Sequence, residues 1–154
     1  MADSIRKQIM DAVIDALKGI SQVNGYQTNV RYVSERWIGY DEVPAKNIPA
    51  VFPVDTDEER EPLQVGIGTT DDTQATLTVV CTCIVYDRYN ETMQQRTDLM
   101  RDVEKALVNN AALAALISYI EPSSITTDGG SITNYSVWDQ TFLITYVYGS
   151  TAGG

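Results

Sequence analysis

The sequence predicts an α+β protein with a mixed, mainly antiparallel sheet, helices packed on one face of it and a long projecting β-hairpin. Apolar residues recur at helical spacing in two segments, strand-like alternation fills the regions between and after them, and one alternating run is unusually long. Helices separated by runs of strands are typical of a sheet with its helices gathered on one side. A chain of 154 residues is most simply one domain, here residues 1–148, and we expect residues 149–154 to be a flexible tail.

Two helices and a shorter third one are predicted. The first opens at Asp3 or Ser4, either of which is a good N-cap, and ends at Gly19. The second covers about Asn90–Asn109, and Ala111–Ile117 adds a short helix. The first helix has a core-facing apolar stripe made of Ile5, Ile9, Val13, Ile14 and Leu17.

The longest predicted strand lies in Gln74–Asp87. At about 3.3 Å per residue, a strand of roughly 13 residues is over about 40 Å long, against a usual length of about 5 to 6 residues. We therefore expect part of it to project from the body, as one arm of a hairpin over Leu63–Tyr86. Its alternation predicts one apolar face formed by Ala75, Leu77, Val79, Cys81, Cys83 and Val85.

Other segments complete the predicted sheet and its connections. Strands are predicted within Tyr26–Tyr40 and at Val137–Tyr148, and the proline-marked segment Ile48–Val54 is typical of an edge strand. The acidic run Asp55–Glu61 and the Ser, Thr and Gly-rich segment Pro122–Asn134 are predicted to be exposed loops.

Charge and composition limit the class of protein. The net charge of −10 argues against binding nucleic acid through its phosphates, which needs clustered Lys and Arg. An acidic wall could still let DNA slide past, although solubility alone is a sufficient reason for the charge. Charged and apolar residues interleave from the N-terminus, so we expect no signal peptide and a protein that stays in the cytoplasm where it is made.

The sequence offers little for catalysis or metal binding. It contains no histidine, which excludes Ser-His-Asp and Cys-His arrangements and any imidazole metal site. Cys81 and Cys83 would point to the same face of one strand, about 7 Å apart, so buried and reduced thiols are expected rather than a disulfide. Gly66 and Gly68 lack the rest of a dinucleotide fingerprint. We therefore expect no enzyme activity, no cofactor and no metal.

Acidic residues around the hairpin are the only candidates for a site. They could form a solvated loop or a subunit contact, hold Mg²⁺ or Ca²⁺, or act as an acid/base pair. Their spacing fits no calcium loop, because the central glycine and the regular alternation are missing. The residues expected at a subunit contact or facing a lumen are Asp57, Glu58, Glu59, Arg60, Glu61, Val65, Ile67, Asp71 and Asp72.

Aromatic residues suggest a second candidate contact. Tyr32, Trp37 and Tyr40 stand near Arg31 and Arg36, and aromatic side chains with arginine are favoured at interfaces. A position in the core or on a sheet face is the alternative for these aromatic residues.

Taken together, the order of these features resembles the tail terminator (tail completion) proteins of tailed bacteriophages. The resemblance covers about Ile5 to Tyr148 and is one of order and pattern, without a short diagnostic motif. It is carried by the helix Ile5–Lys18, the segment Ile48–Val54 before an acidic run, the strand Ala75–Tyr86 leading through Asp87 into the helix Glu91–Val108, and the closing strand Phe142–Tyr148.

The resemblance implies a small structural subunit of the virion, made in the host cytoplasm and placed at the junction of tail and neck. Subunits of this family assemble with copies of themselves into a homo-hexameric ring that caps the last ring of tail tube protein and ends tube polymerisation. The other face of the ring meets the head-completion or connector protein, and DNA passes through the channel without specific binding. The family implies no shared active-site residues, so none is transferred to this chain.

Other functions remain open at this stage. Within virion assembly, the chain could be another neck or tail-tube component, such as a head-tail connector or stopper. A carboxylate metal-dependent enzyme would need its acidic residues to converge around an ion. A cellular dimeric binding module would pair an exposed sheet edge across a two-fold axis.

Overall fold

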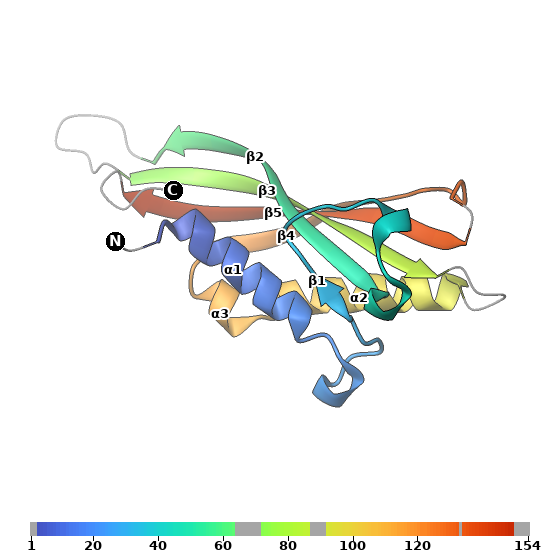
Figure 1. The fold of residues 1–154 in the computed structure, drawn as a ribbon. Coiled ribbons are helices and arrows are strands. Elements are labelled where there is room, and N and C mark those ends of the chain that lie inside the picture. The colour runs from blue at the N-terminus through green and yellow to red at the C-terminus, as the bar shows by residue number, and fades with distance from the viewer. Residues whose placement is uncertain (1–2, 64–71, 87–91, 133, 150–154) are drawn as a thin grey trace, which may run out of the picture.

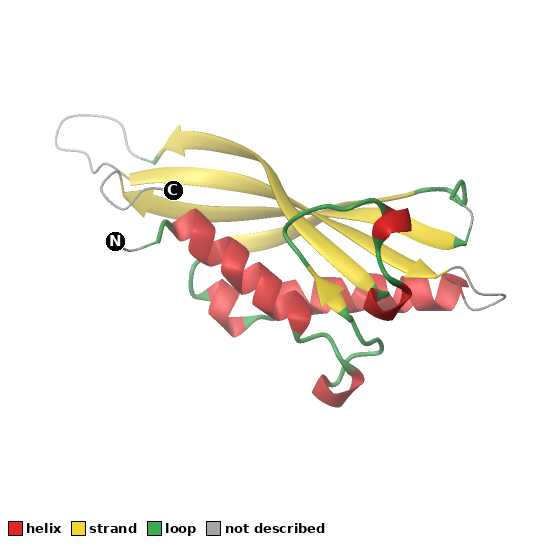
Figure 2. Ribbon diagram, in the orientation of Figure 1, coloured by secondary structure: helices red, strands yellow, loops and turns green. Residues whose placement is uncertain are grey.

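The computed structural model describes residues 3–63, 72–86, 92–132 and 134–149. In this part of the chain, a five-stranded sheet in the order β1-β2-β3-β5-β4 carries three α-helices on one face (Figures 1 and 2). Among the strands that the structure describes, only the β1–β2 pair is parallel, so the predicted α+β class with a mixed, mainly antiparallel sheet is confirmed. The elements are α1 (Ile5–Lys18), β1 (Tyr32–Val33), β2 (Ala50–Pro62), β3 (Asp72–Tyr86), α2 (Thr92–Val108), α3 (Ala111–Ala114), β4 (Tyr119–Thr127) and β5 (Tyr135–Gly149), with 3₁₀ turns η1 (Gln22–Asn24), η2 (Tyr40–Glu42) and η3 (Ala45–Asn47).

Strand β3 is the centre of the sheet. It pairs with β5 along its whole length, and with β2 from Ala50 opposite Ile84 to Pro62 opposite Thr73. The first arm of the hairpin is therefore β2, which ends at Pro62, before Leu63 where we expected that arm to begin, and residues 64–71 lie outside the described residues. The acidic run 55–61 is part of this strand rather than the exposed loop we expected. Cross-strand pairing with β3 outweighs the low strand propensity of the acidic residues.

The inner face of the sheet, which the helices cover, holds the main core. All six β3 residues predicted for the apolar face are buried there. Cys81 and Cys83 are free and fully buried, as expected, and burial raises the pKa of the Cys81 thiol to about 12. Other members of this core are Ile9, Val13 and Leu17 of α1, Leu99, Val103 and Leu107 of α2, and Trp138, Phe142, Ile144 and Tyr146 of β5.

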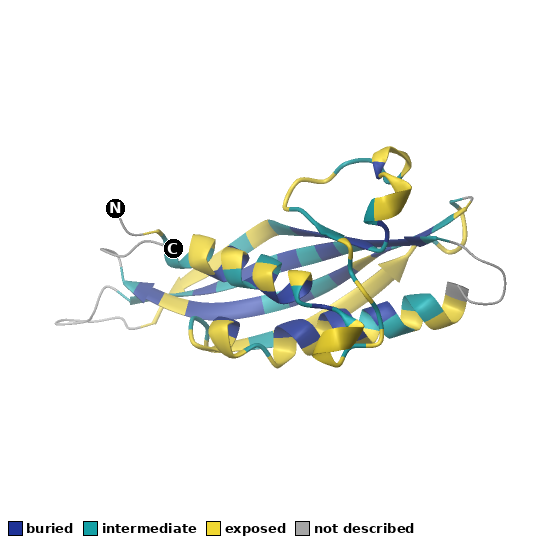
Figure 3. Ribbon diagram, turned by 60° about the horizontal axis from the view of Figure 1, so that its bottom comes forward, coloured by how far each residue is buried: buried dark blue, intermediate teal, exposed yellow. Residues whose placement is uncertain are grey.

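A smaller core lies on the outer face, opposite the helices and at one end of the sheet (Figure 3). There Val43 and Ile48, from the segment before β2, are buried with Phe52 and Ile84. Trp37 packs edge-on against Phe52, with 5.1 Å between ring centroids, and keeps 45% of its surface exposed. The outer face is thus closed at this end by the residues between β1 and β2.

Three further predictions need correction. The strand predicted within Tyr26–Tyr40 has only the two residues of β1, and the third helix ends at Ala114. The segment 122–134, which we expected to be a loop, begins within strand β4. The residues of β4 are nearly all exposed, so the sequence shows no alternation of buried and exposed positions that would identify the strand. Pairing with β5 makes it a strand.

The helix ends follow ordinary capping rules. The side chain of Ser4, rather than Asp3, accepts a hydrogen bond of 3.2 Å from the backbone N–H of Lys7 and caps α1. The predicted cap Asn90 of the second helix lies outside the described residues, as does the tail beyond Gly149. None of the helices in the described part of the chain is both long and apolar enough to span a membrane.

Candidate assembly surface

The outer face of the sheet is uncovered over the half that lies away from Trp37 and Phe52. Within the described chain, no helix or loop lies over this half (Figure 3). Most of its side chains are only partly buried, and threonine and valine, which favour strands, dominate them. We call it the open face, and it is formed by Val54, Thr76, Thr78, Val80, Thr141, Leu143, Thr145 and Val147.

One edge of the sheet is open at the same end. Strand β1 pairs only with Ala50 and Val51, so β2 beyond Val51 has no further partner on that side among the described residues. Three predicted contact residues, Asp57, Glu59 and Glu61, lie exposed on this edge. Charged side chains on an open edge resist unwanted strand pairing, so this acidic edge disfavours contact with another acidic strand.

A β-bulge in β2 decides which acidic side chains turn inward. Asp55 pairs with Val79 and Glu58 with Leu77, so β2 has one residue more than β3 between these two pairs. The extra residue moves Glu58 and Arg60 to the inner face, whereas Glu59 and Glu61 point outward. Glu58, which we had placed among the contact residues, is an internal residue with only 4% of its side chain exposed.

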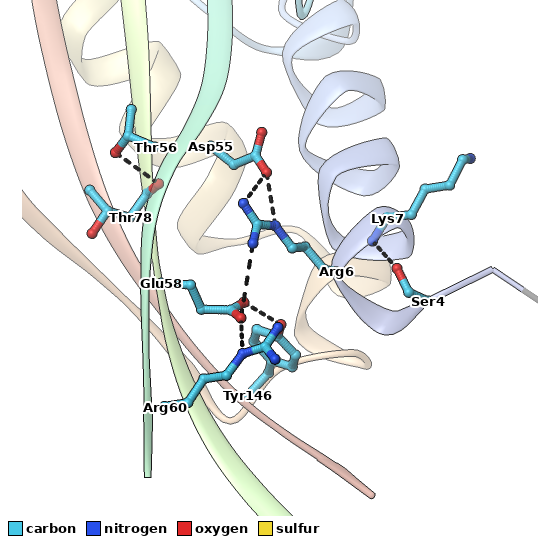
Figure 4. A network of polar contacts seen from close by, with 9 residues as sticks. All are labelled: Ser4, Arg6, Lys7, Asp55, Thr56, Glu58, Arg60, Thr78 and Tyr146. Carbon is cyan, nitrogen blue, oxygen red and sulfur yellow. Dashed lines mark hydrogen bonds and ion pairs between the residues drawn. The ribbon is translucent and has the colours of Figure 1, made fainter. Parts of the chain in front are cut away.

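Glu58 is the centre of a polar network that joins α1, β2 and β5 (Figure 4). Its carboxylate accepts hydrogen bonds from the Tyr146 hydroxyl and, at 2.5 Å, from Nε of Arg60. Nη1 of Arg6 lies 3.9 Å from the same carboxylate, and Nε and Nη2 of Arg6 donate to Asp55 at 2.8 and 2.6 Å. The network therefore ties helix α1 to the outer half of the hairpin.

The chemistry of this network is structural. Burial and the hydrogen bond to Glu58 raise the pKa of the Tyr146 hydroxyl above its ordinary value, so it stays a protonated donor. The carboxylate is neutralised by two guanidinium groups within 4 Å. The guanidinium of Arg60 also lies 5.1 Å from the ring centroid of Tyr148, which fixes its position. These contacts hold the strands in register and leave Glu58 little access to solvent.

The other predicted site residues are placed only in part. Asp72 begins β3 opposite Gly149, close to the open face. Val65, Ile67 and Asp71 lie outside the described residues. Among the residues that the structure describes, no three acidic or cysteine side chains converge so that they could hold a metal ion.

The aromatic residues proposed as an anchor patch pack into the smaller core. Tyr32 contacts Phe52 with 5.9 Å between ring centroids, and Tyr40 contacts Tyr135 at 5.4 Å. Trp37 is the member of the group that presents a large exposed surface. Tyr32 and Tyr40 therefore occupy the packed positions that we gave as the alternative to an anchor patch. Trp37 packs against Phe52 and is also partly exposed.

Two buried polar residues had not been identified in the sequence. Asp102 of α2 is 3% exposed and accepts hydrogen bonds from the backbone N–H groups of Gln27 and Thr28 and from the Thr28 hydroxyl. Gln140 accepts from the indole N–H of Trp138 and donates to the backbone carbonyl of Met100. The available signal in the sequence was that Asp102 and Gln140 each lie on the apolar face of their helix or strand.

The sequence matches no protein-family model and no curated protein.

Proposed function

We propose that the protein is a structural subunit of a tailed-phage virion. In this proposal, copies form a ring that caps the tail tube, ends its polymerisation and joins the tail to the head-completion complex. DNA passes through the channel of the ring without being bound specifically.

The observation that carries the proposal is the open face of the sheet. A three-strand platform of β2, β3 and β5 is held rigid from the inner side by the helices and by the Glu58 network. Its outer side has partly exposed Val, Leu and Thr side chains and the acidic edge of β2. A rigid surface of this kind suits a subunit whose neighbours complete its packing.

Two further features support the same function. The order of α1, β2, β3, α2 and β5 agrees with the order on which the resemblance to tail terminators rests. The net charge of −10 suits a channel that DNA passes without adhering.

The proposal is tested first on the purified protein and then on the virion. Native mass spectrometry across a range of protein concentrations, with electron microscopy of the largest species, should show a closed ring. Cryo-electron microscopy of the virion that carries this chain should place the ring between the last tube layer and the connector. A virion neck that lacks this chain would refute the proposal.

A further inference from the structure

The 3₁₀ turn η1 projects from the helix layer just after α1, at the bottom of Figure 1. At its centre stands Val23, with 95% of its surface exposed. No residue from 19 to 30 carries a charge, in a chain in which 21% of residues are charged. We call residues 21–25 the knob.

The knob is braced on several sides although its apolar tip is exposed. The backbone N–H of Gln22 donates to the side chain of Asn29 at 2.9 Å, and the side chain of Asn24 donates to the carbonyl of Gly19 at 2.8 Å. Nζ of Lys105 lies 3.3 Å from the carbonyl of Gly25, which has a φ of +89° that favours glycine. The knob is therefore ordered before any contact is made, which lowers the entropy lost on binding.

A groove along α2 is a candidate to receive such a tip. It lies between α2 and the edge strand β4 and has a volume of about 350 Å³, and its apolar lining residues are Met100, Pro122 and Ile125. Ile125 keeps 48% of its surface exposed. Residues 122–127 of β4 carry no charge, and the groove lining has one cation and one anion, Arg101 and Glu104, which cancel.

The charge of the molecule indicates which partner fits. Two copies with a net charge of −10 repel each other wherever their acidic surfaces face, and like charges across an interface are unfavourable. The knob and the groove are neutral, so they can meet without that penalty, and interface centres are depleted of charge. We infer that the knob of one copy docks, through Val23, into the α2–β4 groove of a second copy.

This inference rests on the proposed ring and names the contact that closes it. The knob, residues 21–25, shares no residue with the lining of the groove. Arg101 and Glu104 of α2 line both the groove and the hollow beside Gly25, and Lys105 contacts the knob. The knob and the groove are thus different patches of one copy. A contact between different patches can repeat from copy to copy until the ring closes.

Cysteine cross-linking tests the contact directly. A Val23→Cys, Ile125→Cys variant should form disulfide-linked multimers under mild oxidation, visible as a ladder on a non-reducing gel, because Ile125 lines the groove and pairs with the inward-facing Gln140. The native cysteines should stay silent because both are fully buried. The matched control is Asp11→Cys with Ile125→Cys, which moves the first thiol to an exposed position on α1 and should give no ladder.

A second variant measures the contribution of the tip. Val23→Asp should weaken self-association by about tenfold or more, as expected for an apolar anchor, and Val23→Thr should weaken it less. Both variants should keep the wild-type melting temperature, because the side chain at position 23 is almost wholly exposed.

The outcomes separate this inference from the proposed function. In one outcome the wild type forms rings, while the double-cysteine variant gives no ladder and Val23→Asp assembles normally. That result would overturn the knob contact and leave the proposed ring intact. A covalent product that stops at dimers would support the knob contact and count against a ring. A wild type that stays monomeric, together with a double-cysteine variant that gives no cross-link, would overturn the contact as well.

Discussion

The two faces of the sheet are built from the same strands and are packed very differently. On the inner face, side chains from Ala75 to Val85 of β3 are buried along the strand under the helices. On the outer face, the large apolar side chains of the described strands that are fully buried are Phe52 and Ile84, near Trp37, Val43 and Ile48. The difference teaches that one fully packed face is enough to hold the sheet, which leaves the other free for contacts with partners.

The largest expected effect comes from neighbouring residues of β5 that face opposite ways. Ile144 is fully buried on the inner face and Leu143 is only partly buried on the outer face. Ile144→Ala should lower the free energy of unfolding by about 2–5 kcal/mol, because it leaves a cavity in the core. Leu143→Ala should lower it by about 1 kcal/mol or less. Urea denaturation of both variants at low protein concentration measures the contrast.

A third variant tests the buried end of the outer face against its open half. Ile84 is on the outer face but fully buried, so Ile84→Ala should resemble Ile144→Ala rather than Leu143→Ala. Equal losses for Leu143→Ala and Ile84→Ala would mean that the open face is covered within a single copy.

A smaller effect is expected at the polar part of the inner face. Glu58→Ala removes the acceptor of Tyr146 and Arg60, and should lower the free energy of unfolding by about 1–3 kcal/mol because these partners lose their hydrogen bonds. The matched control is the exposed neighbour Glu59, whose replacement by Ala should change stability by about 0.5 kcal/mol or less. Similar losses at the two positions, measured by thermal and urea unfolding, would contradict the inward orientation of Glu58.

The effect that is smallest at neutral pH concerns the inner-face thiols, and it grows only at alkaline pH. In the folded state the pKa of Cys81 is raised to about 12, whereas the pKa of an unfolded thiol is about 8.5. The folded state therefore binds the proton more tightly, and the stability from this thiol is complete below about pH 8.5 and lost as pH rises toward 12. The loss has a slope of at most about 1.4 kcal/mol per pH unit.

Replacement of the thiol isolates this slope. Cys81→Val should flatten the fall of stability between pH 8 and 10 relative to the wild type. Thr78→Val, on the open face, should leave the slope unchanged. Identical slopes for the wild type and Cys81→Val would mean that the thiol is not buried in solution.

The inner face could be predicted from the sequence because burial leaves a periodic signal. Alternation over Ala75–Val85 placed the apolar side chains of β3 on the correct face, and helical spacing placed α1. Strand β4 was missed because it is an exposed edge strand, and its pairing with β5 depends on residues distant in sequence.

The candidate surface was predictable only in outline. The acidic run was identified, yet a single extra residue in β2 determines which of its side chains turn inward, and the sequence has no local signal for that bulge. Val23 was equally invisible, since one valine in a polar turn is ordinary. Its exposure depends on Asn29 and Lys105, which hold the turn away from the core.

The neutrality of the knob and the groove has a consequence for how ionic strength acts on the protein. Dissolved salt shortens the reach of the repulsion between two copies of net charge −10, to about 10 Å at 0.1 M. It leaves an apolar contact between patches without net charge intact, so added sodium chloride should strengthen self-association. Proteins that hold nucleic acid by its phosphates respond in the opposite direction, because salt weakens their binding.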